Sequence, residues 1–357
     1  MSRYLRQQQL PDFGEAGQEK LGQAKVLVVG LGGLGIPVVQ YLNAMGIGTL
    51  GLVEKDTVAL HNLQRQVLYT EKDIGELKLS VVLKQLKAQN SNTKLIAHDT
   101  FLNPQNALEI ISEYDVVVDA TDSFEARYLI NDACIILNKP FIYGALQGFE
   151  GQVSVFNYND GPTYRCLFPN PPKATEIPNC NENGVLGVVP GIIGTLQALE
   201  VVKVVTGIGE PLSGMVLVFD SQNHRYLKIA IQAKPERQKI HELEKSYGNA
   251  DCIQVPGIDA KVFQETIAKD DNPKILDVRS VAEYQVDHLS NSVNIPLDKL
   301  ALPEEFKTQE KPVFVLFQSG KRSEMAVIKL QKEYPELTFY SVLGGMNALN
   351  LVEIQKA

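Results

Sequence analysis

Short apolar runs alternate with glycine turns and amphipathic stretches over the first two thirds of the chain. The stretch KVLVVGLGGLGIPVVQYLNAMGIGTLGLVEKD (25–56) is typical of a buried strand, a glycine turn, a helix and a second strand. Later apolar runs predict further strands at TKLIAHDT, YDVVVDATD, PFIYGAL, EGQVSVFNY and MVLVFDSQNHRYLKIAI. GIIGTLQALEVVKVVTG predicts a long helix that ends at Gly207. The pattern indicates an α/β fold.

The pattern changes after residue 233. KPERQKIHELEKSYGNAD is charged and has no strong apolar period, so we expect a linker over residues 234–255. A second, smaller α/β pattern follows, with strands at PKILDVRS, VFVLF and TFYSVLGG. We therefore predict one domain at 1–233 and another at 256–357.

Composition narrows the class of protein. The chain has 357 residues, a net charge of −8 and no basic block, so nucleic acid is not an expected partner. Its four cysteines share no C-x-x-C spacing, which favours a reducing, cytoplasmic setting. Residues 26–53 carry no charge, but seven glycines and a proline interrupt them, so no membrane partner is expected either.

A glycine pattern follows the first predicted strand. Gly30, Gly32, Gly33 and Gly35 form G-x-G-x-x-G directly before a helix, the context of a nucleotide-binding loop. Glu54 ends the next strand, where it can accept hydrogen bonds from ribose hydroxyls. Taken alone, this segment favours an NAD-dependent dehydrogenase.

Charged residues farther along favour a different nucleotide. Arg65, Lys78, Asp119 and Asp122 follow predicted strands, and the carboxyl ends of strands in an α/β sheet form the ligand crevice. Cations beside carboxylates suit a triphosphate with Mg²⁺, for which Asp122 is our candidate ligand. Each residue alone could instead be a surface ion pair.

Several motifs together resemble one family. RYLRQ, VLVVGLGGLG, VALHNLQRQ, GELK, DATDSFEARYLIND, YRCLFP and NCNENGVLGVVPGIIGTLQALEVVK occur in an order similar to that of the ThiF/MoeB/HesA adenylyltransferases, which resemble ubiquitin-activating enzymes. The resemblance implies a Rossmann-like domain with a mixed sheet. It also implies ATP-dependent adenylylation of the C-terminal glycine of a ubiquitin-like sulfur carrier that ends in Gly-Gly, of the molybdopterin or thiamine type.

The resemblance also implies residue roles. Nucleotide-binding positions would be Gly30, Gly32, Gly33, Glu54, Asn62, Arg65, Lys78, Asp122 and Ser123. Lys78 would stabilise charge at the α-phosphorus, and Asp122 would hold Mg²⁺. Arg6 would reach the γ-phosphate from a second subunit, which implies a homodimer. Glu54 stands where Asp is usual, His61 where Ser is usual and Ser123 where Asn is usual.

The cysteines depart from the family pattern. Many members bind a structural zinc through two C-x-x-C pairs, but here Thr163 replaces one cysteine before Cys166 and no second pair follows. We therefore expect no structural zinc. Cys180 lies at a position proposed to handle sulfur in the family, and both a catalytic thiol and an ordinary loop cysteine remain open. Cys134 is expected in the core.

The second domain resembles a rhodanese through ILDVRSVAEYQVDHLSNSVNIPL, QSGKRS and LGGMNAL. Phe317 occupies the position of the family's catalytic cysteine and cannot carry a persulfide. We expect a module without sulfurtransferase activity that either docks a carrier or another partner, or only contributes stability.

Three alternatives to the carrier adenylyltransferase stay open. One is a pseudoenzyme that holds a partner through both domains, and another is adenylylation of a different carboxylate. The third is a dehydrogenase, which would leave Arg65 and Lys78 without a role.

Overall fold

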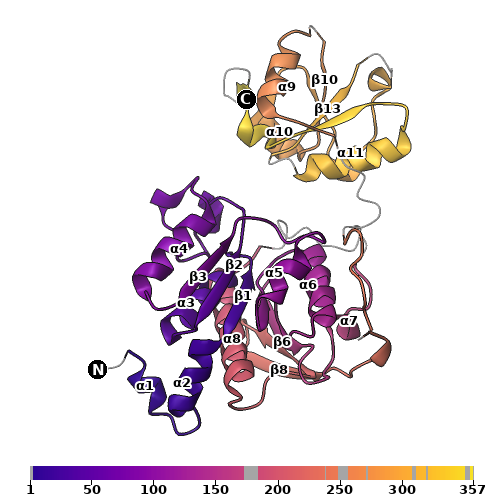
Figure 1. Ribbon diagram of the computed structural model, residues 1–357. Coiled ribbons are helices and arrows are strands. Elements are labelled where there is room, and N and C mark those ends of the chain that lie inside the picture. The colour runs from indigo at the N-terminus through magenta and orange to yellow at the C-terminus, as the bar shows by residue number, and fades with distance from the viewer. Residues whose placement is uncertain are drawn as a thin grey trace. The chain divides into compact units, whose positions relative to one another are not determined.

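The computed structural model describes residues 3–172, 184–237, 239–247, 256–270, 272–307, 311–318, 321–349 and 354–356. The chain divides into two compact units, Met1–Asn249 and Ala250–Ala357 (Figure 1). Each unit has its own sheet and its own apolar core.

The first unit is built on an eight-stranded sheet in the order β3-β2-β1-β4-β5-β6-β7-β8. The strands are β1 Lys25–Val29, β2 Thr49–Val53, β3 Lys94–His98, β4 Val116–Asp119, β5 Phe141–Gln147, β6 Glu150–Phe156, β7 Met215–Asp220 and β8 Arg225–Ala230. Neighbours from β3 to β5 are parallel, and those from β5 to β8 are antiparallel. This is the mixed sheet that the family resemblance implied.

Helices cover both faces of this sheet (Figure 1). The helices of the unit are α1 Leu5–Gln8, α2 Gly14–Gln23, α3 Gly35–Met45, α4 Lys78–Gln89, α5 Ala107–Ser112, α6 Phe124–Ile136, α7 Tyr164–Leu167 and α8 Val188–Thr206. In β1, Val26 and Val28 pack into the core beneath α3 and α8, whereas Leu27 and Val29 pack into the core beneath α5 and α6. Alternate side chains thus enter opposite layers, which explains why the strand is apolar throughout.

Helix α8 is the one helix among the described residues that is both long and apolar enough to cross a membrane. Its apolar stretch has a mean hydropathy of 1.6. Half of that stretch is buried, and α8 packs against α3, β5 and β6 as a core helix does. It ends at Gly207, whose φ of 79° caps the helix as the sequence predicted.

The second unit has a five-stranded parallel sheet in the order β12-β10-β13-β14-β9, and a separate antiparallel pair, β11 and β15. The strands are β9 Gly257–Ile258, β10 Lys274–Asp277, β11 Asp287–Leu289, β12 Ser292–Asn294, β13 Val313–Leu316, β14 Phe339–Val342 and β15 Ile354–Lys356. The helices are α9 Ala260–Ile267, α10 Val281–Val286 and α11 Lys321–Glu333. Short 3-10 helices in the two units are η1 Leu60–Asn62, η2 Glu71–Asp73, η3 Pro235–Arg237, η4 Leu297–Lys299, η5 Glu304–Phe306 and η6 Gly345–Ala348.

Part of the expected linker is attached to the first unit. Arg165 donates to Glu244 at 2.8 Å, and the hydroxyl of the buried Tyr247 donates to Asp132 at 2.9 Å. Described residues of the segment predicted as a linker over 234–255 therefore contact the first unit, and the predicted domain bounds stay a prediction. Polar contacts with residues far away in sequence hold them, and such contacts leave no apolar period to detect.

Candidate functional site

The glycine loop lies between β1 and the first turn of α3. Gly30 has a φ of 93°, and a Cβ there would lie 2.8 Å from the carbonyl oxygen of Ala120. A Cβ on Gly35 would lie 2.0 Å from the carbonyl oxygen of Gly30. These positions require glycine, and the loop therefore packs tightly against the end of β4. The amino end of the 11-residue α3 supplies positive potential for a phosphate here.

Glu54 supports the backbone of this loop. Its buried carboxylate accepts hydrogen bonds from the N–H groups of Leu31 at 3.0 Å, Lys55 at 2.8 Å and Asp56 at 3.0 Å. A carboxylate has about four acceptor positions, so about one remains for a ribose hydroxyl. The predicted ribose contact stays a prediction, but support of the loop is a role that sequence reasoning missed.

The residues after η1 lie alongside the glycine loop. Asn62 is buried, and its Oδ1 accepts from the N–H of Ala59 at 3.2 Å, which fixes the start of η1. Arg65 Cγ lies 3.4 Å from the position of a Cβ on Gly33, so Arg65 is beside the loop, and its predicted role in nucleotide binding stays a prediction. Its guanidinium donates only to the carbonyl of His61 at 3.0 Å among the interactions of the described chain. That leaves most of its donors available for a phosphate.

Lys78 begins α4 and is almost fully buried. Its Nζ lies 3.3 Å from Oδ2 of Asp56. The Asp56 carboxylate is exposed, and the backbone N–H of the same residue donates to Glu54. Asp56 was not predicted from the sequence, because it is one of several acidic residues that follow a strand. The contact holds a cation near the loop without neutralising it in a buried pair.

The end of β4 carries a buried ion pair and an exposed carboxylate. Asp119 is fully buried, accepts from Nε of Arg127 at 2.8 Å and also accepts from the N–H and hydroxyl of Thr121. Burial opposes the charge on Arg127, but Asp119 raises the pKa of its guanidinium above the usual range. Asp122 is exposed, and Ser123 caps α6 by accepting from the N–H of Ala126 at 3.2 Å. Asp122 is therefore presented next to the strand end against which Gly30 packs.

This donor set fits Mg²⁺ only together with a nucleotide. Mg²⁺ takes one or two protein carboxylates and completes its shell with phosphate oxygens and water. Asp122 can supply one such carboxylate. Over the described ranges no group of three or more His, Cys, Asp or Glu side chains could hold a metal ion by itself.

Two predicted site residues are not placed at the loop. The α1 helix that carries Arg6 is fixed where Nε2 of Gln7 donates to the carbonyl of Met45 at 2.9 Å. Met45 ends α3, whereas the glycine loop precedes its start, about 15 Å away along the helix. One chain therefore does not bring Arg6 to its own loop. Cys180 lies outside the described residues.

The site of the family's structural zinc is built differently here. The Cys166 sulfur accepts from the N–H groups of Thr163 and Lys234, both at 3.4 Å. Within the described ranges no second thiol, imidazole or carboxylate joins Cys166 in a metal-binding group. These residues do not fit a structural zinc, and direct contacts connect the segments instead. Cys134 is fully buried, which raises the pKa of its thiol far above the usual range.

The rhodanese-like loop begins at Phe317, directly after β13. Phe317 is only 7% exposed and packs into the apolar core with Val315, Ala326 and Val327. Arg279 lies fully buried behind it and binds Asp277, Asp287 and Gln318. Residues 319 and 320 lie outside the described ranges.

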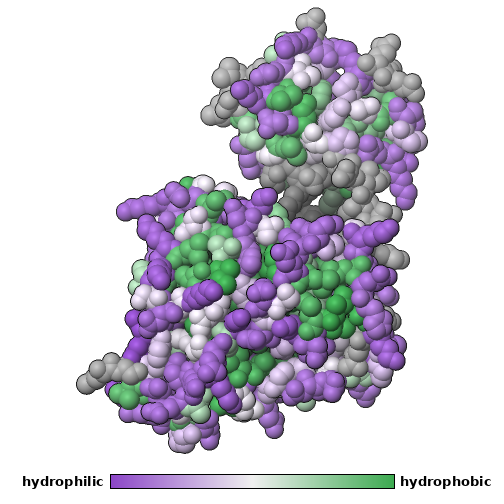
Figure 2. All heavy atoms as spheres, viewed as in Figure 1, coloured by the Kyte–Doolittle hydropathy of each residue, from purple (hydrophilic) through white to green (hydrophobic). Residues whose placement is uncertain are grey.

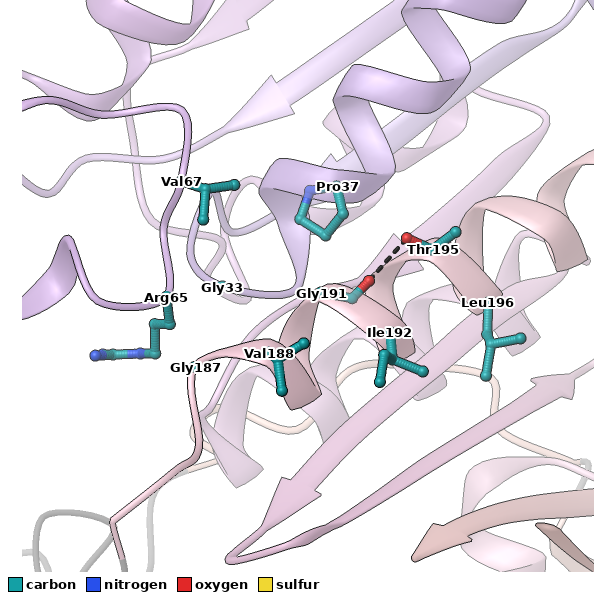
Figure 3. A pocket seen from close by; sticks show the side chains of 10 residues that line it. All are labelled: Gly33, Pro37, Arg65, Val67, Gly187, Val188, Gly191, Ile192, Thr195 and Leu196. Atoms are coloured by element: carbon teal, nitrogen blue, oxygen red, sulfur yellow. Dashed lines mark hydrogen bonds between the residues drawn. The ribbon is translucent and has the colours of Figure 1, made fainter. Parts of the chain in front are cut away.

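An apolar groove of about 450 Å³ opens beside the glycine loop (Figure 3). It is lined by Gly33, Pro37, Arg65, Val67, Gly187, Val188, Gly191, Ile192, Thr195 and Leu196. Val67 and Val188 are more than half exposed, although both are apolar. Figure 2 shows other apolar patches between hydrophilic residues on the first unit.

The model of the ThiF family matches residues 4–240, and the model of the rhodanese-like domain matches residues 259–351. The chain belongs to the ThiF family. A Zea mays protein named adenylyltransferase and sulfurtransferase MOCS3-2 is 39% identical over 377 residues, which cover 97% of this chain and 78% of that protein. The Xenopus laevis protein named adenylyltransferase and sulfurtransferase MOCS3 is 41% identical over 92% of this chain and 78% of its own length.

Solved structures agree with the fold of the first unit. The crystal structure of E. coli MccB with ATP has a TM-score of 0.58 and 25% identity, covering 66% of this chain and 73% of that chain. The structure of E. coli MccB with AMPCPP and MccA has a TM-score of 0.59 at the same identity and coverage.

Proposed function

We propose that this protein uses ATP to adenylylate the C-terminal glycine of a ubiquitin-like sulfur carrier. One observation carries the proposal: Arg65 packs against Gly33, Lys78 pairs with Asp56 just after β2, and the exposed Asp122 follows the end of β4. All three residues thus follow the carboxyl ends of parallel strands, where ligands bind in α/β sheets. The names of the MOCS3 relatives, which contain adenylyltransferase, support it. The carrier is of the molybdopterin or thiamine type, and we expect the reaction in the cytoplasm.

The proposed reaction needs positioning and charge rather than a base. A carrier carboxylate is ionised at neutral pH, and its oxygen attacks the α-phosphorus of ATP. A bond from that oxygen to phosphorus forms, the bond to the bridging oxygen breaks, and pyrophosphate leaves with the electron pair. Lys78 and Arg65 stabilise the negative charge that develops on the phosphoryl oxygens. Asp122 would hold Mg²⁺, which neutralises phosphate charge when bound.

We propose that a second copy of the chain supplies Arg6. Gln7 and Tyr4 fix α1 at the far end of α3, so α1 cannot swing back to its own loop. Leu5 and Leu10 flank Arg6 and are 41% and 57% exposed. The apolar groove beside Gly33 offers a matching surface on the other copy, and burial of both surfaces would favour a symmetric dimer.

Mixing two inactive variants tests this dimer. Arg6→Ala and Lys78→Ala homodimers should each be inactive, whereas random mixing regenerates about a quarter of the wild-type sites. Each mixed dimer then has one site with both wild-type residues. Activity that stays at the level of the separate variants would contradict a shared site.

We also propose that the rhodanese-like unit does not transfer sulfur through position 317. The relatives are named sulfurtransferases as well, so this chain would differ from them in that step. Phe317 stands in the core of the unit, and no cysteine follows Cys252 in the sequence. A sulfur-transfer role would then require a thiol outside the loop, with Cys180 as the candidate from the first domain.

Carrier-dependent exchange between ATP and labelled pyrophosphate tests the proposed reaction. Purified protein, Mg²⁺ and each small protein of the source organism that ends in Gly-Gly are combined in turn. Exchange with one of them would establish the reaction class and the partner together. ATP binding without exchange would indicate another carboxylate substrate or a pseudoenzyme, and binding of NAD alone would indicate a dehydrogenase.

A further inference from the structure

Two side chains hold the glycine loop at Leu31, one through its backbone N–H and the other through its backbone carbonyl. The N–H of Leu31 donates to Glu54 at 3.0 Å, and its carbonyl oxygen accepts from the hydroxyl of Tyr69 at 2.9 Å. Leu31 is itself fully buried, so neither backbone group can turn to water without opening the loop. Glu54 comes from the end of β2, whereas Tyr69 comes from the segment between η1 and η2.

That segment follows the loop residue by residue. Arg65 lies against Gly33, Gln66 lies against Gly32 with its Nε2 3.6 Å from the position of a Cβ there, and Tyr69 bonds to Leu31. The Oε1 of Gln66 is buried and has no hydrogen-bond partner among the described residues, which is a costly arrangement. The glycine loop and the segment that carries the candidate phosphate ligand Arg65 therefore pack directly against each other.

The buried hydroxyl of Tyr69 stays protonated and can therefore donate to the carbonyl of Leu31. Tyr69 is 5% exposed, and burial, with Glu54, Asp56 and Asp73 nearby, raises the pKa of its hydroxyl far above the usual range. The hydroxyl therefore keeps its proton at neutral pH and can donate it. No other donor to the carbonyl of Leu31 occurs among the hydrogen bonds of the described residues.

We propose that Tyr69 is a positioning residue for nucleotide binding, which it supports by holding the carbonyl of Leu31 so that the loop N–H groups keep the shape of an anion site. This rests on the proposed function in so far as the nucleotide is ATP. Tyr69 touches no phosphate. It keeps the loop in the competent conformation before the nucleotide arrives, so that binding does not first have to order the loop.

Tyr69→Phe removes one oxygen and leaves the ring in place. We expect the Kd for ATP with Mg²⁺, measured by calorimetry on the full chain, to rise about tenfold, which corresponds to about 1.4 kcal/mol. The reason is that only a fraction of the variant would hold the competent loop. Tyr128→Phe is the matched control, because the Tyr128 hydroxyl also donates to backbone carbonyls, of Phe168 at 3.0 Å and Asn170 at 2.7 Å, within the same unit.

Hydrogen exchange gives a readout that does not depend on catalysis. We expect the amides of residues 30–35 to exchange faster in Tyr69→Phe than in Tyr128→Phe, and ATP to restore their protection in part. Carrier-dependent exchange in the variant should show a raised KM for ATP with kcat nearly unchanged. A variant that loses thermal stability but binds ATP as tightly as wild type, with unchanged loop exchange, would overturn the proposal.

The outcome separates this inference from the proposed function. If the wild-type chain binds NAD and not ATP, the adenylyltransferase proposal fails, and Tyr69→Phe is judged with NAD, for which the same tenfold loss is expected. If the wild-type chain binds neither nucleotide, both proposals are overturned.

Discussion

Both units have a short loop between a parallel strand and a helix, but the side chains at the two loops differ. In the first unit the loop after β1 lies beside Arg65, and Glu54 and Tyr69 hold its backbone. In the second unit the loop after β13 begins with Phe317, whose ring packs inward. Behind it, Arg279 is bound by carboxylates of its own unit rather than presented to a ligand.

The difference shows that the order of strand, loop and helix can be kept while the side chains at the loop change. A helix that starts after a strand offers N–H groups and positive potential to an anion, and packing of the sheet keeps the strand and the helix in place. Reaction chemistry depends on the few side chains at the mouth. In the second unit the residue at the mouth now contributes to the core, so the unit can remain folded without the family's nucleophile.

The largest effect should follow from Arg279→Ala. The Arg279 side chain is 1% exposed and paired with Asp277 and Asp287, and removing one partner of a buried network costs about 3–5 kcal/mol. We expect the second unit to unfold, as measured by hydrogen exchange of β10 and β13. Pyrophosphate exchange should persist, because no candidate nucleotide residue comes from this unit.

A surface variant provides the control for that experiment. Lys307→Ala removes an exposed ion pair with Glu304 in the same unit, which should change its stability little. Loss of pyrophosphate exchange in Arg279→Ala but not in Lys307→Ala would contradict the independence of the two loops.

The next largest effect concerns the first loop. Lys78→Ala or Asp122→Ala should lower the rate of carrier adenylylation by about 10²–10³, because one charge contact to the transition state is lost. Lys84→Ala, on the exposed face of α4, is the matched control and should leave the rate unchanged. Wild-type rates in both site variants would refute this site.

The contrast between the loops also marks what sequence can predict. Glycine spacing and apolar alternation are local patterns, and they located the β1 loop, the α/β order and the cap at Gly207 correctly. The mixed sheet came from the family resemblance instead. The position of Phe317 in the rhodanese motif was equally visible. Each of these features depends on residues close together in the sequence.

Contacts between distant residues were not predictable in this way. Tyr247 binds Asp132 across 115 positions, and Tyr69 binds Leu31 across 38. A tyrosine within an apolar run has no signal that tells a core position from a loop support. The separation of Arg6 from the loop likewise required knowing where α1 packs.

A smaller effect is expected when the missing nucleophile is restored. Phe317→Cys should give detectable thiosulfate:cyanide sulfurtransferase activity, whereas we expect none from the wild-type chain. It should also destabilise the second unit by about 3 kcal/mol, because a large core side chain is lost. Phe306→Cys, in the same core but away from the loop, should cost similar stability without activity. Activity in the wild-type chain, or equal activity in both variants, would refute the assignment of position 317.

The smallest expected effect concerns how the stability of the first unit depends on pH. His98 ends β3, and its Nε2 lies 2.8 Å from the hydroxyl of Tyr114. Burial lowers the pKa of His98 below its ordinary value of 6.5, so the unfolded chain binds a proton more readily than the folded one. The stability contributed by the neutral ring is therefore complete above that pH and declines as the pH falls below it.

His98→Gln should remove this part of the acid sensitivity of the first unit. Because the ring is partly exposed, solvent reduces the effect, and we expect a difference below about 1 kcal/mol between about pH 7.5 and about pH 5.5. Urea unfolding followed through the first unit measures it, and His224→Gln, at an exposed position in the same unit, is the control. A pH dependence that is identical in wild type and His98→Gln would show that His98 is not the group responsible, and the acid sensitivity of this unit would then have to arise from its carboxylates or its other histidines.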